Sequence, residues 1–371
     1  MIGSFDIVVI GGGVMGSAAA LQLARGGMRV ALCEARQLCS GASGVNAGTL
    51  SMQTKRIPLI PYALRGYDLW KRAGDAVGFK ETGSLTLAYT EREAEVLITR
   101  MSARREVGAP IELIATSAAH AMEPNLGDGV VAASYCAADG YANSSLTGVY
   151  YRSQLRLAGV ALYELTPVQK IVPDGSEVMV QTRAGALRGT RVLLATGAWA
   201  KQMSEQMGTP LPIRVRVNTV SVTERMARLV TRVIAHASGQ LTLKQSPNGT
   251  VLIGGAWQGR GTPETWHSDI APETLIANLR LAQHVLPRLA EGRLVRSWTG
   301  FEGQTPDFVP LAGLMPGANN VFVLGCVRSG YTIGPYIGRL MGDFMLGREP
   351  ELPLFDPARF FPERTRRESL S

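Results

Sequence analysis

Three glycines and one acid near the start of the chain have the types and spacing needed to bind a dinucleotide. Gly11, Gly13 and Gly16 form a G-x-G-x-x-G sequence directly after the apolar run at 7–10, and Glu34 follows a second apolar run. The first glycine permits a tight turn, the second lets the backbone approach a pyrophosphate, and the third lets a helix pack closely on a strand. The acid is placed to accept hydrogen bonds from ribose hydroxyls.

The elements that must position these residues are a strand, a helix and a second strand. Residues 6–10 predict the first strand, the helix begins after Gly13, and residues 29–33 predict the second strand, which leads into Glu34. The free N–H groups at the start of the helix then point at the phosphates. The run at 7–21 is apolar, but its glycine-rich centre favours a strand–turn–helix unit over a membrane span.

The bulk composition is that of an ordinary globular protein. The 371 residues are 46% hydrophobic and 18% charged, which allows two domains with substantial cores. The net charge is +8, and part of the excess lies in the arginine-rich stretch at 359–371. Because no basic stripe with interleaved aromatic residues is present, we expect no nucleic-acid partner. The charge instead favours a carboxylate substrate or a partner subunit.

The cysteines and the N-terminus bear on the cellular compartment. Cys33, Cys39, Cys136 and Cys326 include no C-x-x-C pair, so we expect no metal or iron–sulfur ligation and reduced cytosolic thiols. The N-terminus lacks the basic segment of a signal peptide, and no transmembrane segment is predicted. We therefore expect a cytoplasmic protein, with peripheral attachment to the inner membrane left open.

Further helices and strands are expected along the chain. The predicted helices cover 59–74, 91–107, 149–158, 272–284 and 334–346. The predicted strands cover 83–88, 161–165, 168–172, 177–182, 191–196, 215–222, 241–244, 251–253 and 321–324. Features of a nucleotide site recur at 1–50, 165–200 and 320–346, with other segments between them. The cofactor domain is therefore expected to be discontinuous.

Four stretches carry a resemblance to one family. They are GGGVMG with Glu34, SGASGVNAG at 40–48, LLATGAW at 193–199, and Thr305-Pro306-Asp307 followed by 321–335. In this order and spacing, the chain resembles the D-amino-acid oxidase superfamily of FAD enzymes. Members of this superfamily include glycine oxidase, sarcosine oxidase beta subunits, D-amino-acid and hydroxyproline dehydrogenases, and opine dehydrogenase catalytic subunits.

The resemblance, together with the order of the predicted elements, implies an α/β fold with two domains. A discontinuous, Rossmann-like FAD-binding domain is expected over 1–84, 146–212 and 296–371. A second, α+β domain with a mostly antiparallel sheet is expected over 85–145 and 213–295, and it would bind the substrate.

The resemblance also assigns residues to FAD. Ser43 and Gly44 match positions that hold the pyrophosphate, residues 46–48 match positions that line the flavin, and the backbone of Val168 matches a contact to the adenine ring. The segment 330–334 would meet the flavin pyrimidine edge, and it opens a helix whose positive end would stabilise charge on the reduced flavin. The complete set expected to bind FAD is Gly11, Gly13, Val14, Met15, Gly16, Glu34, Ala35, Arg36, Ser43, Gly44, Asn46, Ala47, Gly48, Val168, Thr196, Gly197, Gly330, Tyr331, Thr332 and Ile333.

Two residues are candidates for catalysis under this resemblance. Arg328 matches the arginine that binds the substrate carboxylate, and its planar guanidinium can bind a carboxylate through two hydrogen bonds. The competing interpretation makes Arg328 a surface or interdomain salt-bridge residue. Tyr331 is expected either to contact the substrate or to pack on the flavin.

The chain departs from the family pattern at positions that concern the cofactor and the electron acceptor. Gly300 stands where flavin-linked sarcosine oxidases carry a cysteine, so FAD is expected to be bound non-covalently. Leu252 stands near the position at which those oxidases carry a lysine that assists oxygen reduction. The leucine in place of this lysine favours a dehydrogenase. Lys244 and Gln245 are expected at a solvated strand end, with contact to the substrate as the alternative.

These features predict an FAD-dependent dehydrogenase or oxidase of a small, carboxylate-bearing amine. The expected reaction is oxidation of the C–N bond by hydride transfer from Cα to flavin N5, which gives an imine. Secondary amines such as hydroxyproline, N-alkyl amino acids or opines are favoured. The alternatives are a D-amino-acid dehydrogenase and a flavin-bearing subunit that is active only within a hetero-oligomeric complex. Whether the electron acceptor is a quinone, a partner subunit or oxygen stays open.

Overall fold

The computed structural model describes residues 2–362, which form two compact units. The first unit contains residues 2–44, 145–216 and 302–362, and the second contains 45–144 and 217–301. The sequence groups 45–84 with the nucleotide-binding ranges, whereas the structure groups these residues with the second unit. Strands at 49–50 and 80–81 both pair with 140–141, which ties this segment to the second unit. The end of the arginine-rich stretch, 363–371, lies outside the described residues.

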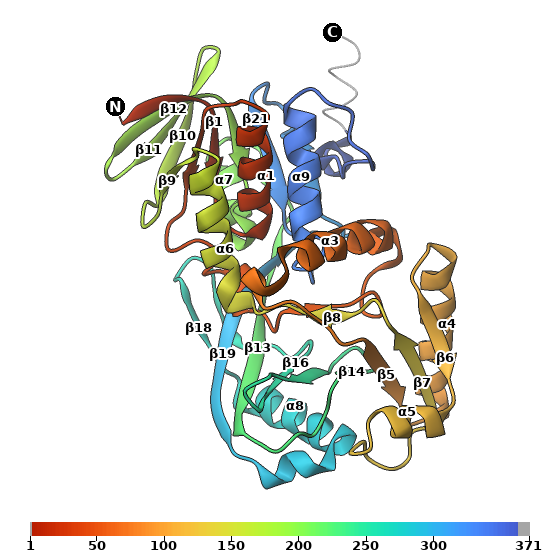
Figure 1. Ribbon diagram of the computed structural model, residues 1–371. Coiled ribbons are helices and arrows are strands. Elements are labelled where there is room, and N and C mark those ends of the chain that lie inside the picture. Colours follow the sequence, from red (N-terminus) through yellow and green to blue (C-terminus); the bar gives the residue numbers. More distant parts are fainter. Residues whose placement is uncertain (1, 363–371) are drawn as a thin grey trace. The chain divides into compact units, whose positions relative to one another are not determined.

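The sheet of the first unit is mainly parallel (Figure 1). Its strands are β1 (Gly3–Ile10), β2 (Val30–Cys33), β9 (Ala161–Tyr163), β10 (Val168–Asp174), β11 (Glu177–Thr182), β12 (Gly185–Leu194), β20 (Leu311–Leu314) and β21 (Val321–Gly325). β1 pairs in parallel with β2 and β12, and β9 and β21 extend the parallel part. β10 and β11 form an antiparallel extension, and β20 pairs antiparallel with β21. β12 begins earlier than the predicted 191 because its first half pairs with β11.

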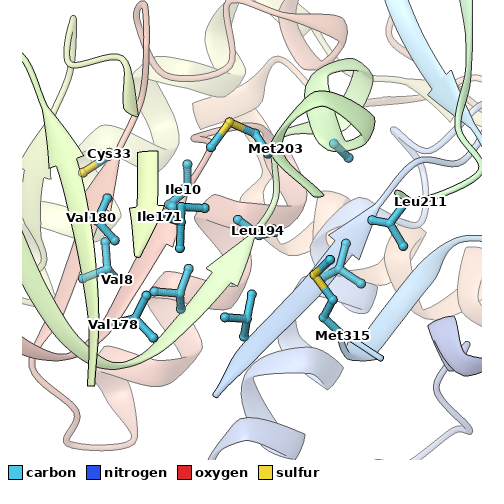
Figure 2. Close-up of a cluster of buried hydrophobic side chains, with 14 of the residues drawn as sticks. Val8, Ile10, Cys33, Ile171, Val178, Val180, Leu194, Met203, Leu211 and Met315 are labelled. Atoms are coloured by element: carbon cyan, nitrogen blue, oxygen red, sulfur yellow. The ribbon is translucent and has the colours of Figure 1, made fainter. Parts of the chain in front are cut away.

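One face of this sheet carries the core of the first unit, and Figure 2 shows many of its side chains. Successive side chains of a strand point to opposite faces. Val8 and Ile10 of β1 therefore share a face, and their partners in the parallel register, Val192 and Leu194 of β12, continue it. Met203 from the helix that follows β12 covers this layer. Ile7 and Val9, on the opposite face of β1, are buried as well, and burial on both faces explains why the sequence shows this strand as an apolar run.

The helix after the glycine turn packs side by side with the last long helix of the chain (Figure 1). These are α1 (Val14–Arg25) and α9 (Gly334–Met345). A Cβ at Gly334 would lie 2.5 Å from Cγ1 of Val14, and one at Gly338 would lie 2.5 Å from the carbonyl oxygen of Met15. Glycines four residues apart on α9 therefore allow the two helices to approach closely. The remaining helices of this unit are α6 (Ser144–Leu157), α7 (Ala200–Glu205), η3 (Gly197–Trp199) and η5 (Pro357–Phe360), and the short α2 (Ala42–Val45) ends at the limit between the units.

The second unit is built on a mostly antiparallel sheet of eight strands. In spatial order they are β19 (Leu294–Gln304), β13 (Arg214–Arg225), β16 (Thr250–Gly254), β15 (Thr242–Gln245), β14 (Val233–His236), β5 (Ser84–Ala88), β7 (Ala132–Cys136) and β6 (Ile111–Ile114). β14 and β5 pair in parallel, whereas β15 pairs antiparallel with both of its neighbours. Smaller sheets contain β3 (Thr49–Leu50), β8 (Gly140–Tyr141) and β4 (Lys80–Glu81), and β17 (Arg260–Thr262) with β18 (His267–Asp269).

Helices cover this sheet at several places (Figure 1). They are α4 (Glu91–Glu106), α5 (Thr116–Met122) and α8 (Pro272–Val285). The same unit also contains α3 (Ile60–Ala73) and the 3₁₀ turns η1 (Ile57–Leu59), η2 (Gly74–Val77) and η4 (Pro287–Glu291). α4 contacts β5, β6 and β7, and α8 contacts β16. The expected fold class, α/β with a Rossmann-like unit and a second α+β unit with a mostly antiparallel sheet, is confirmed. Among residues 2–362, no helix is both long enough and apolar enough to cross a membrane.

Candidate cofactor and substrate site

The glycine-rich segment that contains the turn after β1 and the first residues of α1 has no room for a side chain at Gly11 or at Gly16. Gly11 has φ of 105°, and a Cβ there would lie 2.4 Å from the carbonyl oxygen of Ala195. A Cβ at Gly16 would lie 2.1 Å from the carbonyl oxygen of Gly11. The turn is therefore held tightly against the end of β12. The first N–H groups of α1 are placed at this turn, where a helix can bind an anion.

Glu34 fixes the same turn from the end of β2. One carboxylate oxygen of Glu34 accepts a hydrogen bond of 2.7 Å from the Gly12 N–H, and the other accepts one of 2.9 Å from the Arg36 N–H. A carboxylate oxygen can accept more than one hydrogen bond. The carboxylate is therefore oriented at the carboxyl end of β2 and can still accept a hydrogen bond, and its contact with a ribose hydroxyl stays a prediction.

The loop after β2 reaches back to the start of α1. The Ser43 hydroxyl oxygen accepts a hydrogen bond of 2.9 Å from the Val14 N–H in the first turn of α1. A Cβ at Gly13 would lie 3.2 Å from this same oxygen. Ser43 thus lies at the helix end where a pyrophosphate is expected, and Gly44 follows it in the short helix α2.

The segment after β12 supplies groups that suit a dinucleotide. Within residues 2–362, the buried hydroxyl of Thr196 has no hydrogen-bond partner. A buried hydroxyl without a partner is costly, so this atom is suited to a ligand. Gly197 has φ of 54°, and its carbonyl accepts a hydrogen bond of 3.2 Å from Cys326. The guanidinium of Arg36 lies 6.0 Å from the centre of the Trp199 ring. Val168, whose backbone is expected to contact the adenine ring, is the first residue of β10.

The segment before α9 lies against the start of α1. A Cβ at Gly330 would lie 3.1 Å from Cε of Met15. Thr332 and Ile333 are fully buried, and the Tyr331 hydroxyl forms a hydrogen bond of 2.7 Å with the Thr147 hydroxyl of α6. Burial raises the pKa of Tyr331. Because its hydroxyl is paired and stays neutral, a packing role fits Tyr331 better than proton transfer, and a contact with the flavin or substrate stays a prediction.

The turn between β21 and α9 carries Arg328 in a strained backbone. Cys326 and Ser329 have φ of 60° and 58°, a region that non-glycine residues rarely adopt. The Ser329 N–H donates a hydrogen bond of 2.7 Å to the Glu302 carboxylate, which holds the turn. Strained residues concentrate at ligand sites. Arg328 itself is half-buried, and its guanidinium forms no hydrogen bond or ion pair with any residue in the described part of the chain.

Within the second unit, the residues expected to line the flavin form a fixed loop. The Asn46 side chain accepts a hydrogen bond of 2.7 Å from the Gly48 N–H, and the Asn46 carbonyl accepts one of 2.8 Å from the Ser144 hydroxyl. Gly48 has φ of 71°, and a Cβ there would lie 2.0 Å from the carbonyl oxygen of Ala142. Only glycine fits this position, which explains one glycine of the SGASGVNAG stretch.

Lys244 and Gln245 are not at a solvated strand end, and that prediction is wrong. Lys244 is 2% exposed and Gln245 is 5% exposed, on β15, which lies between β14 and β16 in the sheet. The Lys244 ammonium donates hydrogen bonds to the Ala47 carbonyl and, at 3.1 Å, to the Thr49 hydroxyl. Gln245 accepts a hydrogen bond of 2.7 Å from the Leu229 N–H. Lys244 therefore anchors the segment that is expected to line the flavin.

The sequence names Lys244 but does not predict its burial, because that burial depends on the neighbouring strands and segments. Lys244 pairs directly with Leu252 in the antiparallel register, so the two side chains point to the same face of the sheet. The leucine at position 252 therefore does not mean that this face of the sheet lacks a lysine. Burial lowers the pKa of Lys244 to about 7.

Replacing Lys244 by methionine is expected to change how stability depends on pH. An unfolded lysine keeps its proton to about pH 10.4, whereas folded Lys244 loses it above about pH 7. The unfolded state binds more protons between these values, so the wild-type free energy of unfolding gains about 1.4 kcal/mol per pH unit there. Relative to Lys244→Met, the wild-type Tm should rise from pH 7 to pH 9. Lys170→Met, at an exposed lysine, is the control, and parallel Tm profiles of wild type and Lys244→Met would contradict this expectation.

Comparison with known proteins gives the family. The chain matches the DAO family, described as FAD dependent oxidoreductase, over residues 6–344. The chain belongs to this family. As a DAO-family FAD-dependent oxidoreductase, the protein uses FAD, and the glycine turn, the Glu34 carboxylate and the unpaired Thr196 hydroxyl fit a bound dinucleotide.

Relatives extend over nearly the whole length of this DAO-family chain. It is 31% identical to glycine oxidase of Geobacillus kaustophilus (strain HTA426), over 94% of this chain and 95% of the relative. It is 26% identical to an opine oxidase subunit of Agrobacterium tumefaciens (strain Ach5), over 97% of this chain and 98% of the relative. Among solved structures, L-proline dehydrogenase from P. horikoshii superposes with a TM-score of 0.90 at 25% identity, over 98% and 99% of the two chains.

Proposed function

We infer that this enzyme oxidises the C–N bond of a small amino or imino acid to an imine, with secondary amines favoured over primary ones. FAD, when bound, supplies the acceptor for the hydride that leaves the substrate Cα. The substrate classes in view are hydroxyproline, other N-alkyl amino acids and opines.

The half-buried guanidinium of Arg328 is the observation that carries this proposal. It lies in a strained turn between β21 and α9, in the same unit as the glycine turn. A guanidinium offers two parallel N–H donors to a carboxylate, which fixes the position and the orientation of an amino acid. The names of the relatives agree with this chemistry, since glycine and proline are amino acids.

The protein residues have mainly a positioning task in this reaction. Arg328 would hold the substrate carboxylate, and the segment at 330–333 would hold the cofactor at the start of α9. Positioning of this kind can supply a large part of a rate enhancement without an acid or base. The positive end of α9 would favour negative charge at its N-terminus.

Two alternatives stay open beside this proposal. A D-amino-acid dehydrogenase would use the same Arg328 contact with a primary amine. A flavin-bearing chain that needs partner chains is favoured by the opine oxidase relative, whose name describes it as one subunit of that enzyme. The electron acceptor, a quinone, a partner subunit or oxygen, differs among these alternatives, and a cytoplasmic location stays a prediction.

Anaerobic reduction of the purified protein tests the proposal. The flavin absorbance at about 450 nm is followed with D-amino acids, glycine, sarcosine, the isomers of proline and hydroxyproline, and opines. Bleaching by secondary amines supports the proposal, and bleaching by primary D-amino acids alone favours the first alternative. Bound FAD that no compound bleaches favours a missing partner subunit.

Acid precipitation is expected to release all of the FAD into the supernatant. A Cβ at Gly300 would lie 2.2 Å from Cγ2 of Val45, so any side chain at this position would require Val45 to move. The packing therefore leaves no room for a cysteine that could link the flavin. Yellow colour that stays in the washed precipitate would mean a covalent link elsewhere in the chain.

A further inference from the structure

A carboxylate that the sequence does not assign to the site is bound to the turn that carries Arg328. Glu302 lies near the end of β19 and falls, like Arg328, within the first unit. Its Oε1 atom accepts a hydrogen bond of 2.7 Å from the N–H of Ser329, the residue directly after Arg328. Both Glu302 and Arg328 are half-buried. One turn thus brings together an acid and a base from distant parts of the chain.

This turn lies at the edge of the sheet where a ligand is expected. It follows β21, which pairs in parallel with β12, and β12 pairs in parallel with β1. Ligands of open parallel sheets bind beyond the carboxyl ends of the strands. The glycine turn follows the carboxyl end of β1, so both turns lie at the same edge. Through its bond to Ser329, the Glu302 carboxylate is held at this edge as well.

Arg328 and Glu302 do not neutralise each other. Arg328 forms no hydrogen bond or ion pair with residues 2–362, so Glu302 is not its ion-pair partner. A half-buried guanidinium without a counter-ion is costly, and a direct bond to the acid at the next residue would reduce this cost. The structure instead keeps the two charged groups apart. A molecule with one negative and one positive group would satisfy both of them.

The bond to Ser329 orients the Glu302 carboxylate and leaves it able to accept further hydrogen bonds. A carboxylate offers about four acceptor sites on its two oxygens, and the Ser329 N–H occupies one site on Oε1. Ser329 has φ of 58°, so its N–H points in a direction that an ordinary turn would not give. The acid is therefore fixed in place before any ligand binds.

We propose that Glu302 binds the amine of the substrate while Arg328 binds its carboxylate, so that the two residues together recognise the zwitterion of an amino acid. This proposal rests on the proposed function, since it assigns a further specificity-determining residue to the same site. The two groups of an α-amino acid are attached to one carbon, so contacts with both of them fix the orientation of its Cα–H bond.

The chemistry of the oxidation is compatible with such a contact. The amine that loses a hydride from Cα must have its lone pair available, and is therefore neutral at that step. A neutral primary or secondary amine still has an N–H, which can donate to the Glu302 carboxylate. An acid without an amine would gain only the contact with Arg328 and would leave Glu302 facing an apolar group. Glu302 thus selects for the amine, and Arg328 selects for the carboxylate.

Equilibrium binding of two compounds of the same shape to the FAD-loaded protein tests the proposal without turnover. 2-Aminoisobutyrate and pivalate each have a carboxylate, and they differ by an ammonium in place of one methyl group. Neither has a hydrogen on Cα, so neither can be oxidised there. Calorimetry measures both affinities, and 2-aminoisobutyrate is expected to bind about 10- to 100-fold more tightly at neutral pH. Equal dissociation constants, or tighter binding of pivalate, would overturn the proposal.

Variants of Glu302 identify the residue responsible. Glu302→Gln keeps an oxygen for the Ser329 N–H but removes the charge, so it should reduce the preference for 2-aminoisobutyrate to about threefold or less. Its affinity for pivalate should stay within about twofold of wild type, because Arg328 is unchanged. Glu349→Gln removes an exposed acid of the same unit and should keep the full preference.

Two outcomes with these variants contradict the assignment. A preference that Glu302→Gln leaves intact would overturn it. Equal weakening of both compounds would also overturn it, because a residue that only holds the turn affects both alike. If Glu302→Gln does not fold, the wild-type ratio and Glu302→Asp still decide, since the shorter acid should give an intermediate preference.

Turnover separates this proposal from the proposed function. With the amine that reduces the flavin fastest, Glu302→Gln should lower kcat/KM about tenfold or more, and Glu349→Gln should leave it unchanged. An unchanged kcat/KM in Glu302→Gln would overturn the proposal while the proposed function stands. If no amine reduces the flavin, the proposed function fails, and the two unreactive compounds still report whether Glu302 binds an ammonium.

Discussion

Replacing Arg328 by leucine is expected to lower kcat/KM for an amino-acid substrate by about 100- to 1000-fold. The substitution removes two charge-assisted hydrogen bonds to the substrate carboxylate and leaves that carboxylate without a partner. It also removes the contact that orients the Cα–H bond, so kcat should fall as well as affinity. Steady-state kinetics with the compound that bleaches the flavin, at saturating electron acceptor, measures both effects.

The FAD content keeps this prediction separate from a folding defect. Arg328 lies in the turn before α9 and touches no residue of the glycine turn through a hydrogen bond or ion pair in the described chain, so Arg328→Leu should retain FAD. Arg328→Lys keeps the charge but loses the planar fork, and an intermediate kcat/KM is expected. A loss of less than about threefold in Arg328→Leu, with full FAD content, would assign the carboxylate to another residue.

The cofactor end of the site could be predicted from the sequence because its parts are local. The strand, the glycine turn, the helix and Glu34 are contiguous in the chain, and each has a recognisable residue pattern. Local patterns fix which residues must be glycine and where the acid must stand. The structure supplies the physical reasons, such as the collision that a Cβ at Gly16 would make with the Gly11 carbonyl.

The surroundings of Lys244 could not be predicted in the same way, because strands that are distant in the sequence meet there. Lys244 is buried against the segment that contains Ala47 and Thr49, far earlier in the chain, and nothing in the sequence around Lys244 marks this contact. Buried charges of this kind depend on pairing between remote strands, which hydrophobic periodicity does not encode.

The division of the chain shows the same limit. The predicted range 1–84 follows the nucleotide motifs, which end before 50, and no local signal marks a change of unit near Gly44. The grouping of 45–84 depends instead on the pairing of β3 and β4 with β8 and on β5 entering the second sheet. Strand pairings of this kind, and not turn residues alone, determine where the chain passes from one compact unit to the other.

Replacing Gly11 by alanine is expected to give a protein that retains less than about a tenth of the wild-type FAD. The new Cβ would lie 2.4 Å from the Ala195 carbonyl oxygen, and φ of 105° is unfavourable for any L residue. The turn must therefore move away from the end of β12. A shifted turn no longer presents the first N–H groups of α1 to the pyrophosphate. The ratio of absorbance at about 450 nm to that at 280 nm measures the loss.

A matched glycine distinguishes collision at the cofactor turn from backbone strain alone. Gly159 also has a positive φ, of 74°, but a Cβ there would meet no atom within 4 Å. Gly159→Ala should therefore lower Tm modestly and keep its FAD.

Glu34→Gln, which retains the shape of the side chain, should weaken FAD binding about tenfold or more because it removes the charged acceptor of the Gly12 and Arg36 N–H groups. Full FAD content in Gly11→Ala would mean that the cofactor does not depend on this turn, and the assignment of the pyrophosphate to the start of α1 would then be wrong.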